Sequence, residues 1–419
     1  MTSLSTKLAE LEAAGKPIQV GIIGAGKFGS TYISQSHRNK GVRLAAIADL
    51  SPERALSALR RTGFPEHKYD PTNSISLEEG LRQGNGSTAA GVCHVLLCYE
   101  HKKHIVMVKV EADVLAGLLL TREAKEAGII YSMAYGDQPA LIAEMIDWAQ
   151  TTVFDVVCAG EGKKYLPQYH ESTPDTVSNH YGSTKEQLVT GDFNPQMSNS
   201  FLDGTKSALE MAAVANECDL GSPSDGLKFP PCGAYDLPRV LRPKEDGGQP
   251  QKKGMVGVVS CLEMDGRWVF NYLRWGVYVV IEAPGDYQRD FFKQYGLKTD
   301  PTGKYTAQYK RYHLIGLELG ISIATITVRG EPTADLKASE KLDGEGGFMA
   351  YGKLMTAEDS LAIEGLPIGL AHSIVPKNDI KKGHNLSWAD VEYTDSPRPL
   401  QLGEKWRLPT GRDLRWLER

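Results

Sequence analysis

The sequence predicts an α/β protein that opens with parallel strands joined by crossover helices. The first observation is a β-branched run, Ile18–Ile23, that leads directly into a glycine-rich turn. The second is another apolar run, Val42–Ala48, that ends at an acidic residue, Asp49. The third is the alternation of apolar runs with helical stretches, which continues to residue 159. Together they predict a parallel sheet with helices packed against it.

The glycine turn reads Gly24-Ala25-Gly26-Lys27-Phe28-Gly29, a GxGxxG pattern between a strand and a helix. Its three glycines would allow a tight turn, the approach of a pyrophosphate and close packing of helix on strand, in that order. A lone GxGxxG is often only a structural turn, whereas strand, glycines, helix and acid in register indicate dinucleotide binding. The predicted cofactor-binding residues are Gly24, Gly26, Lys27, Phe28, Gly29, Asp49 and Arg54.

The choice between NAD and NADP stays open. The carboxylate of Asp49 would accept hydrogen bonds from a ribose hydroxyl and favours NAD. Ser51 and Arg54 stand just beyond it and could accept the 2′-phosphate of NADP. Both cofactors are therefore expected candidates.

Composition excludes several classes of function. The 419 residues exceed what one core usually holds, so two or three domains are expected. A net charge of −5 and the lack of a basic stripe argue against nucleic-acid binding. The six cysteines form no CxxC pair, which argues against a zinc knot and a disulfide framework, and no HExxH motif is evident. Met1–Lys16 is typical of an amphipathic helix, not of a signal peptide, and no apolar run is long enough to span a membrane. A cytoplasmic location is expected.

The remaining elements follow from hydrophobic periodicity and capping signals. They are expected as a helix from Pro52 with Ser51 as N-cap, a helix at 89–101, a strand at 104–108, a helix at 114–127, a strand at 129–132, a helix at 138–150 and a strand at 154–159. Residues 160–205 predict long polar loops of the kind found beside substrates, followed by a helix at 204–216. From residue 254 the sequence predicts antiparallel strands at 255–262, 268–271 and 275–282.

Six further stretches carry a resemblance that spans nearly the whole chain. They are HIVMVKVEADV, YSMAYGDQPALI, FLDGTKSALEMAAVAN, FPPCGAYDLPRVL, YHLIGLELGISIA and YGKLMTAEDSLAIEGLPIGLAH. The chain resembles bacterial homoserine-dehydrogenase-like oxidoreductases with a C-terminal SAF domain, a family that includes 1-deoxy-D-xylulose 5-phosphate reductoisomerase-like enzymes. The resemblance implies a Rossmann dinucleotide-binding domain at 1–158, an α+β catalytic and dimerisation domain at 159–335 and a SAF-like β module at 336–419. It also implies hydride transfer between NAD(P)H and a small polyol, amino-alcohol or sugar-phosphate substrate, in a homodimer or higher homo-oligomer.

The sequence departs from these relatives in three places. Between SISLEEGLRQGNG and STAAGVCHVLLC it lacks roughly two dozen residues of a standard βαβ crossover, whose strand would line the nicotinamide side. Lys109 stands where the relatives usually have asparagine, and RGEPTADLKASEKLDGEGGF lacks the first strand of the SAF module. The Rossmann sheet is therefore expected to be shortened. A second hypothesis follows, in which the protein binds a nucleotide or small ligand without catalysis.

The predicted catalytic residues lie at the start of the helix at 204–216. Lys206 and Glu210 stand four residues apart on one helix face, with Asp203 just before the helix. Reduction of a carbonyl needs a proton donor and a cation that stabilises the developing oxyanion, and a lysine held by carboxylates can supply either. A solvated ion pair is the alternative. The resemblance to the reductoisomerase-like branch also leaves open a divalent cation held by Asp203, Glu210 or Glu111.

Five more residues are predicted to bind substrate: Glu111, Asp113, Lys163, Lys164 and His313. Glu111 and Asp113 follow a buried strand, where open α/β sheets bind ligands, or they complement a helix dipole. Lys163 and Lys164 are expected in a glycine loop, placed for a phosphate or carboxylate or merely charged. His313 is a candidate proton carrier or a structural histidine. Asp137, in the turn Gly136-Asp137-Gln138-Pro139, is expected to be an N-cap.

Overall fold

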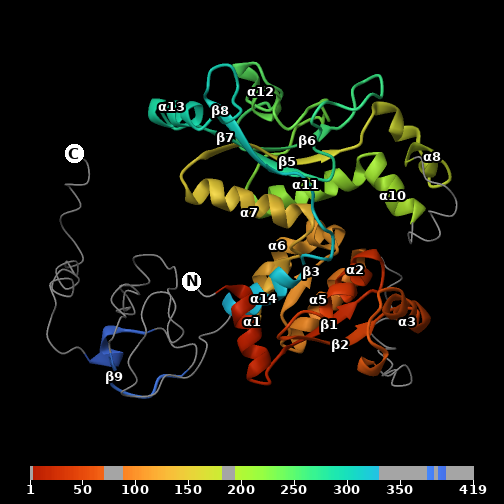
Figure 1. The fold of residues 1–419 in the computed structure, drawn as a ribbon, viewed down its shortest axis with the longest axis vertical. Coiled ribbons are helices and arrows are strands. Elements are labelled where there is room, and N and C mark those ends of the chain that lie inside the picture. The colour runs from red at the N-terminus through yellow and green to blue at the C-terminus, as the bar shows by residue number, and fades with distance from the viewer. Residues whose placement is uncertain (1–2, 70–87, 182–193, 330–374, 382–385, 393–419) are drawn as a thin grey trace. The chain divides into compact units, whose positions relative to one another are not determined.

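The computed structural model describes residues 3–69, 88–181, 194–329, 375–381 and 386–392. The chain divides into two compact units, one formed by residues 17–326 and the other by residues 1–16 with 327–419 (Figure 1). The larger unit is a mixed α/β structure, which confirms the predicted fold class. It contains every predicted site residue.

The first βαβ segment has the predicted form. Its elements are β1 (Ile18–Ile23), α2 (Lys27–Ser36), β2 (Val42–Ala48) and α3 (Pro52–Arg61). The two strands pair in parallel, with Ile18 opposite Val42. Ser51 caps α3 as predicted, because its Oγ accepts a hydrogen bond from the Arg54 amide.

The second pair of strands forms a separate parallel sheet. Its strands are β3 (Ile105–Met107) and β4 (Tyr131–Met133). The helix α5 (Thr88–Glu100) precedes β3, and α6 (Val110–Ala127) connects the two strands. No strand joins β1 to β3 within the described residues. Residues 70–87, where the shortened crossover is expected, lie outside them. Parallel sheets are normally covered on both faces. Ile23 at the end of β1 departs from this rule, since it is 54% exposed.

A four-stranded mixed sheet forms the second half of the larger unit. Its order is β6-β5-β7-β8, from β5 (Asp155–Lys163), β6 (Met255–Ser260), β7 (Val277–Glu282) and β8 (Tyr305–Lys310). The expectation of antiparallel strands from residue 254 is wrong for β6, which runs parallel to β5. The chain returns from β5 to β6 through helices that cover the sheet, so β6 starts from the same end. Residues 268–271 form no strand and contribute only an isolated bridge at Trp268, whereas β7 and β8 are antiparallel.

The strand β5 is longer than predicted. The sequence GEGKK suggests a glycine loop after residue 159, but β5 continues to Lys163. A Cβ atom on Gly160 or Gly162 would collide with the backbone carbonyl of Gly257 or Leu273, respectively. These glycines therefore allow neighbouring backbones to approach closely inside the sheet. The interpretation of Lys163 as a loop residue is wrong for this reason.

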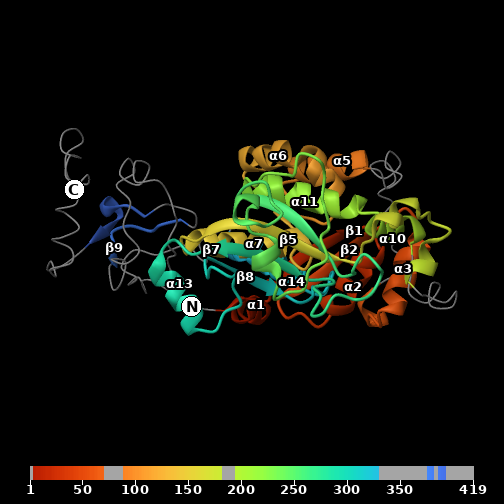
Figure 2. The same cartoon turned by 90° about the horizontal axis from the view of Figure 1, so that it is seen from above.

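Two long helices cover one face of this sheet: α7 (Gln138–Thr151) and α11 (Thr205–Cys218) (Figures 1 and 2). Their apolar residues form the main core with the strands, namely Leu141, Ile142, Met145, Ile146, Met211 and Val214 against Ala159, Val256, Val258, Val277 and Val279. On the opposite face, Leu237 of α12 (Leu237–Val240) packs in a second core with Val280 and Tyr305. The sheet is thus dry on both faces, and α7 and α11 bring their N-terminal ends to the end of β5.

The other described elements of residues 17–329 are short. They are α8 (Val177–Tyr181), α10 (Pro195–Leu202), α13 (Asp286–Gln294) and α14 (Gly320–Arg329), with 3₁₀ turns at Glu66–Lys68, Pro167–Glu171 and Lys244–Asp246. All six cysteines are free, as the absence of a pairing pattern predicted. None of the helices in the described part of the chain has the length and apolarity needed to cross a membrane.

The smaller unit contributes α1 (Leu4–Ala13), whose N-cap Ser3 accepts a hydrogen bond from the Thr6 amide. Its other described elements are the antiparallel strands β9 (Val375–Pro376) and β10 (Val391–Glu392), with a 3₁₀ turn at Trp388–Asp390 between them. Most of residues 336–419, where a SAF-like module is expected, lies outside the described residues, as does the segment predicted to lack its first strand.

Candidate functional site

The glycine turn after β1 has the geometry that a bound dinucleotide requires. Gly24 adopts a φ of +99°, and a Cβ on Gly29 would collide with the Gly24 carbonyl oxygen, so the helix packs tightly on the turn. A Cβ on Gly26 would meet nothing within 4 Å, which leaves open space in front of the helix. Gly26 is the N-cap of α2, and no side chain caps this end. The residues fit a pyrophosphate at the helix N-terminus.

Asp49 braces this turn. Its Oδ2 atom accepts a hydrogen bond of 2.8 Å from the Ala25 amide, and its Oδ1 atom accepts one of 3.0 Å from the Ser51 amide. The side chain of Asp49 is 4% exposed, whereas that of Arg54, 3.8 Å away, is 64% exposed. Asp49 therefore ties the glycine turn to the end of β2, and Arg54 is the accessible cation next to it.

Lys206 forms an ion pair with a residue other than the predicted Glu210. Its Nζ lies 2.9 Å from Oε1 of Glu111, which stands in the first turn of α6. Burial is the largest effect and raises the pKa of Glu111, but the charge and hydrogen bond of Lys206, a backbone hydrogen bond and the charge of Lys109 together lower the net pKa below the ordinary value. Two predicted site residues are thus brought together at the carboxyl end of β3.

A second buried lysine, Lys163, stands at the end of β5. Its Nζ lies 3.0 Å from Oε2 of Glu210 and 3.3 Å from Oε2 of Glu161. It also donates a hydrogen bond of 3.1 Å to Oε1 of Gln138. Burial lowers the pKa of Lys163, but the two carboxylates outweigh this effect and raise it above the ordinary value. Lys163 is therefore a permanently charged ammonium at neutral pH.

Asp137 lies beside both lysines, at the end of β4. It caps α7 as predicted, since its Oδ1 accepts a hydrogen bond from the Gln138 amide. Burial, followed by the charge of Glu210, raises the pKa of Asp137 to about 7 despite the opposing charges of Lys206 and Lys163. This carboxyl group exchanges its proton near neutrality, which makes it suited to proton transfer.

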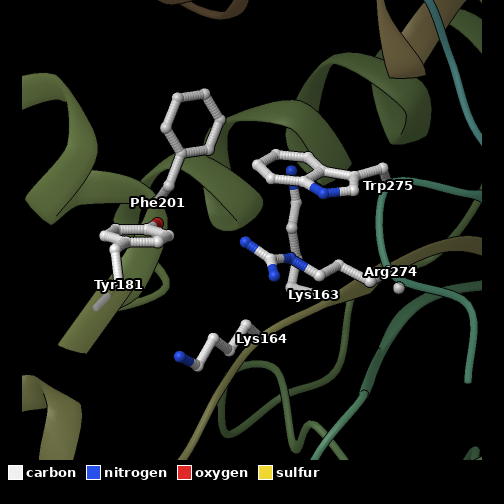
Figure 3. A pocket seen from close by; sticks show the side chains of 7 residues that line it. Lys163, Lys164, Tyr181, Phe201, Arg274 and Trp275 are labelled. Carbon is white, nitrogen blue, oxygen red and sulfur yellow. The ribbon is translucent and has the colours of Figure 1, made fainter. Parts of the chain in front are cut away.

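Lys163 lines a pocket that also carries Lys164 and Arg274 (Figure 3). Aromatic rings of Tyr181, Phe201 and Trp275 form its walls. The Arg274 guanidinium lies 4.8 Å from the Trp275 ring and 5.7 Å from that of Trp268. Lys164 donates a hydrogen bond to the His180 carbonyl oxygen, and burial followed by the charge of Arg274 lowers its pKa. Within the described residues no carboxylate forms an ion pair with Lys164 or Arg274, so the pocket is electropositive.

His313 lies at the rim of this cluster. Its Nδ1 is 2.8 Å from the Trp275 carbonyl oxygen, to which it can only donate. Burial is the main cause that lowers the pKa of His313. The charge of Lys163 lowers this pKa further, whereas the hydrogen bond to Trp275 and the charge of Glu210 raise it. The imidazole is thus neutral, with Nε2 as a proton acceptor.

Two predicted residues take no part in the lysine cluster. The Asp203 carboxylate accepts a hydrogen bond from the Thr205 amide and so acts at the start of α11. Asp113 accepts a hydrogen bond of 2.7 Å from the Tyr131 hydroxyl, and burial raises its pKa. Asp113 and Asp137 line a second small cavity between β3, β4 and α7.

Sequence reasoning missed Glu161, Arg274 and the aromatic walls of the pocket. Glu161 and Lys163 are two residues apart in a strand, so their side chains share a face. The alternation of charged residues in GEGKK is typical of a strand, but its glycines favour a prediction of a loop. Arg274 reaches the pocket from the loop between β6 and β7, and no local pattern predicts this contact. Within the described residues, no group of three acidic, histidine or cysteine side chains could hold a metal ion.

Residues 136–319 match the model of a family described as the catalytic domain of oxidoreductase DRL. This segment contains both buried lysines, Asp137, Arg274 and His313. The part of the chain with the lysine cluster is thus similar to an oxidoreductase catalytic domain. No curated protein matches the sequence closely enough to count as a relative.

Several solved structures are similar to the chain at low identity. GenD2 from gentamicin A biosynthesis, in complex with NAD, is 12% identical over 35% of this chain and has a TM-score of 0.26; the chain covers only 44% of GenD2. A putative myo-inositol dehydrogenase from Sinorhizobium meliloti 1021 is 12% identical over 74% of this chain and 85% of its own, with a TM-score of 0.34. The 1-deoxy-D-xylulose 5-phosphate reductoisomerase from Zymomonas mobilis, in complex with NADPH, is 13% identical over 75% of this chain and 81% of its own, with a TM-score of 0.31.

Proposed function

We propose that the protein is an NAD(P)-dependent oxidoreductase, homoserine-dehydrogenase-like in its general reaction, that acts on a small hydroxylated or sugar-phosphate-like substrate. One observation carries the proposal: a buried, permanently charged lysine, Lys163, lines a pocket at the end of a sheet whose segment matches an oxidoreductase catalytic domain. The glycine turn after β1 supports nucleotide binding by the same chain. The cytoplasmic location and the homodimer inferred from sequence stay predictions.

The cofactor, when bound, supplies or accepts the hydride. Gly24, Gly26 and the first turn of α2 would hold its pyrophosphate. During carbonyl reduction, negative charge develops on the substrate oxygen, and a fixed ammonium stabilises it without reorganisation. Lys163 is suited to this role because its charge persists, whereas Asp137, with a pKa of about 7, is suited to exchanging the proton.

The pocket favours a substrate that carries an anionic group. Arg274 and Lys164 place two cations beside the rings of Tyr181 and Trp275 (Figure 3). A guanidinium held between indole rings presents its donors in a fixed plane, which suits a carboxylate or phosphate. Orientation of the substrate by this group would bring its hydroxyl carbon toward Lys163.

The experiment that tests the proposal begins with the cofactor. NADH and NADPH are titrated into the purified protein, and nicotinamide fluorescence and thermal shift are followed for the wild type and for Gly26→Trp. Micromolar binding that the tryptophan abolishes supports the proposal and justifies turnover screens with polyols, amino alcohols and sugar phosphates. If neither nucleotide binds, the proposal fails.

A second candidate function rests on the interrupted sheet. The β1–β2 and β3–β4 pairs share no hydrogen bonds in the described part of the chain. The crossover strand that the sequence is predicted to lack would line the nicotinamide, and a protein without it would bind a nucleotide or small ligand without turnover. Cofactor binding without activity on any hydroxylated substrate class would favour this candidate.

A further inference from the structure

Glu161 is a buried charge-bearing group that the proposed reaction does not use. Its side chain is fully buried, and neither of its carboxyl oxygens has a hydrogen-bond partner. Its one cationic neighbour, Lys163, lies 3.3 Å away and is closer to Glu210, at 3.0 Å. An ionised carboxylate in this position would lack the hydrogen bonds that normally offset its desolvation.

The charges around Glu161 also disfavour its ionised form. The groups that act on Glu161 are Lys163 on its own strand and Glu210 and Ser207 on α11, and Glu161 in turn acts on Tyr278 of β7. Asp137, Gln138 and His313 interact with Lys163 or Glu210, and Lys206 acts on Asp137. Lys206 is already paired with Glu111. Two carboxylates, Glu161 and Glu210, thus share a single ammonium. Two like charges in a dry site cannot both remain ionised around one cation.

We propose that Glu161 is a neutral carboxylic acid, so that of Glu161 and Glu210 only Glu210 carries a charge, and that this charge balance positions the Lys163 ammonium. With Glu161 protonated, the Glu161, Glu210 and Lys163 cluster is electrically neutral. Lys163 is then held by one carboxylate and by the amide oxygen of Gln138, and its ammonium lies against the pocket without an excess of buried negative charge. Glu161 is a positioning residue, because the pocket lining does not include it. The use of Lys163 in catalysis rests on the proposed function, whereas the protonation of Glu161 does not.

The buried position also explains the direction of the protonation equilibrium. Burial is the main cause that raises the pKa of Glu161 well above its ordinary value, and the charge of Glu210 adds to it. In the unfolded chain the same group ionises in the ordinary carboxyl range. The folded protein therefore binds one proton more than the unfolded chain between these two pKa values, and folding becomes less favourable as pH rises.

The test compares folding stability across pH in the full chain. Urea unfolding of the wild type, Glu161→Gln and Glu210→Gln is measured between about pH 5 and pH 8. The glutamine at 161 replaces a neutral acid by a neutral amide, so the ratio of its folding constant to that of the wild type should rise about tenfold per pH unit. In Glu210→Gln, Glu161 is the remaining carboxylate beside Lys163 and should ionise, so the ratio for this variant should also rise with pH. A ratio for Glu161→Gln that stays flat or falls as pH rises overturns the proposal.

Infrared spectroscopy supplies a second readout that does not depend on unfolding. The wild type at about pH 8 should show the carbonyl stretch of a protonated buried carboxyl, and Glu161→Gln should lack it. Asp137→Asn is the matched control, since Asp137 has a pKa of about 7 and its own band should titrate away near that pH. If the Glu161→Gln spectrum matches the wild type, Glu161 is ionised. Neither readout needs a cofactor or a substrate, so the proposed function can fail while this inference stands.

Discussion

Lys206 of α11 and Glu111 of α6 form an ion pair of 2.9 Å between the helix that covers the mixed sheet and the helix that follows β3. Their side chains are 10% and 23% exposed, so the pair lies out of bulk water. A partly buried pair couples its partners more strongly than a surface pair. This contact links the half of the larger unit that contains β1 to β4 to the half that carries the pocket.

A double-mutant cycle measures this link. Lys206→Met, Glu111→Gln and the double variant are unfolded in urea, and the interaction energy is expected to be about 1 to 3 kcal/mol. Each single variant leaves one partly buried partner unpaired. The double variant should therefore lose less unfolding free energy than the two single variants lose together. An interaction energy near zero would show that the pair does not join the two halves.

Lys163→Met should abolish turnover far more than it affects cofactor binding. Removal of a fixed charge that stabilises an oxyanion costs about 10²- to 10³-fold in kcat. The variant also leaves Glu210 unpaired, so circular dichroism and NADPH titration must accompany the kinetics. Lys103→Met is the matched control, because Lys103 is exposed. Unchanged kcat in Lys163→Met would remove this lysine from the reaction.

Arg274→Ala should weaken binding of an anionic substrate and leave cofactor affinity unchanged. Loss of a charge-assisted hydrogen bond costs roughly 1.5 to 3 kcal/mol, which corresponds to a rise in KM of about 10- to 100-fold. Arg274→Lys should recover part of the loss. The control is Arg267→Ala on the same loop, where the exposed Arg267 pairs with Asp265. Equal effects of the two alanine variants would rule out an anion site at Arg274.

Two glycine variants separate stability from binding in the turn after β1. Gly29→Ala places a Cβ against the Gly24 carbonyl and should lower the unfolding temperature. Gly26→Ala places one in open space and should leave that temperature unchanged while it weakens NADH and NADPH binding. Thermal unfolding and fluorescence titration distinguish these effects. If Gly26→Ala binds both nucleotides as the wild type does, the pyrophosphate does not lie against this residue.

Asp137 should make folding less favourable as pH rises from about 4 to 7. Its pKa is about 7 in the folded protein and 3.8 is its ordinary value, so the folded state holds the extra proton between these limits. The stability lost across this window is roughly 4 kcal/mol. Asp137→Asn keeps an N-cap side chain and should remove this pH dependence. Urea unfolding at several pH values is the measurement, and a parallel pH profile in the variant would contradict it.

The features that the sequence predicted well are local. The strand Ile18–Ile23, the Ser51 cap and the helix from Gln138 depend on short-range periodicity and capping, and each lies where it was expected. The predicted Lys206, Glu210, Glu111 and Lys163 do gather near one another, but as different pairs. Which carboxylate meets which lysine depends on how α6, α11 and β5 pack, and no local pattern encodes this.

The misses have a common physical cause. Glycines in GEGKK resemble a loop, yet in the folded sheet they make room for the backbones at Gly257 and Leu273. The parallel direction of β6 depends on the path of the chain through α11. The place of Arg274 in the pocket depends on the position of a loop far along the chain. Each of these features is set by tertiary contacts that the residues around it do not reveal.

The double hydrogen bonding of Asp49 limits how the cofactor preference of this protein can be redesigned. Replacing that acid to admit a 2′-phosphate would release the Ala25 and Ser51 amides together, and would loosen the turn that is proposed to hold the nucleotide. The side chain of Arg54 lies 3.8 Å from Asp49 and is largely exposed, so its replacement would leave the two hydrogen bonds of Asp49 in place. A designer who wishes to switch between NAD and NADP should therefore vary Arg54 and leave Asp49 in place.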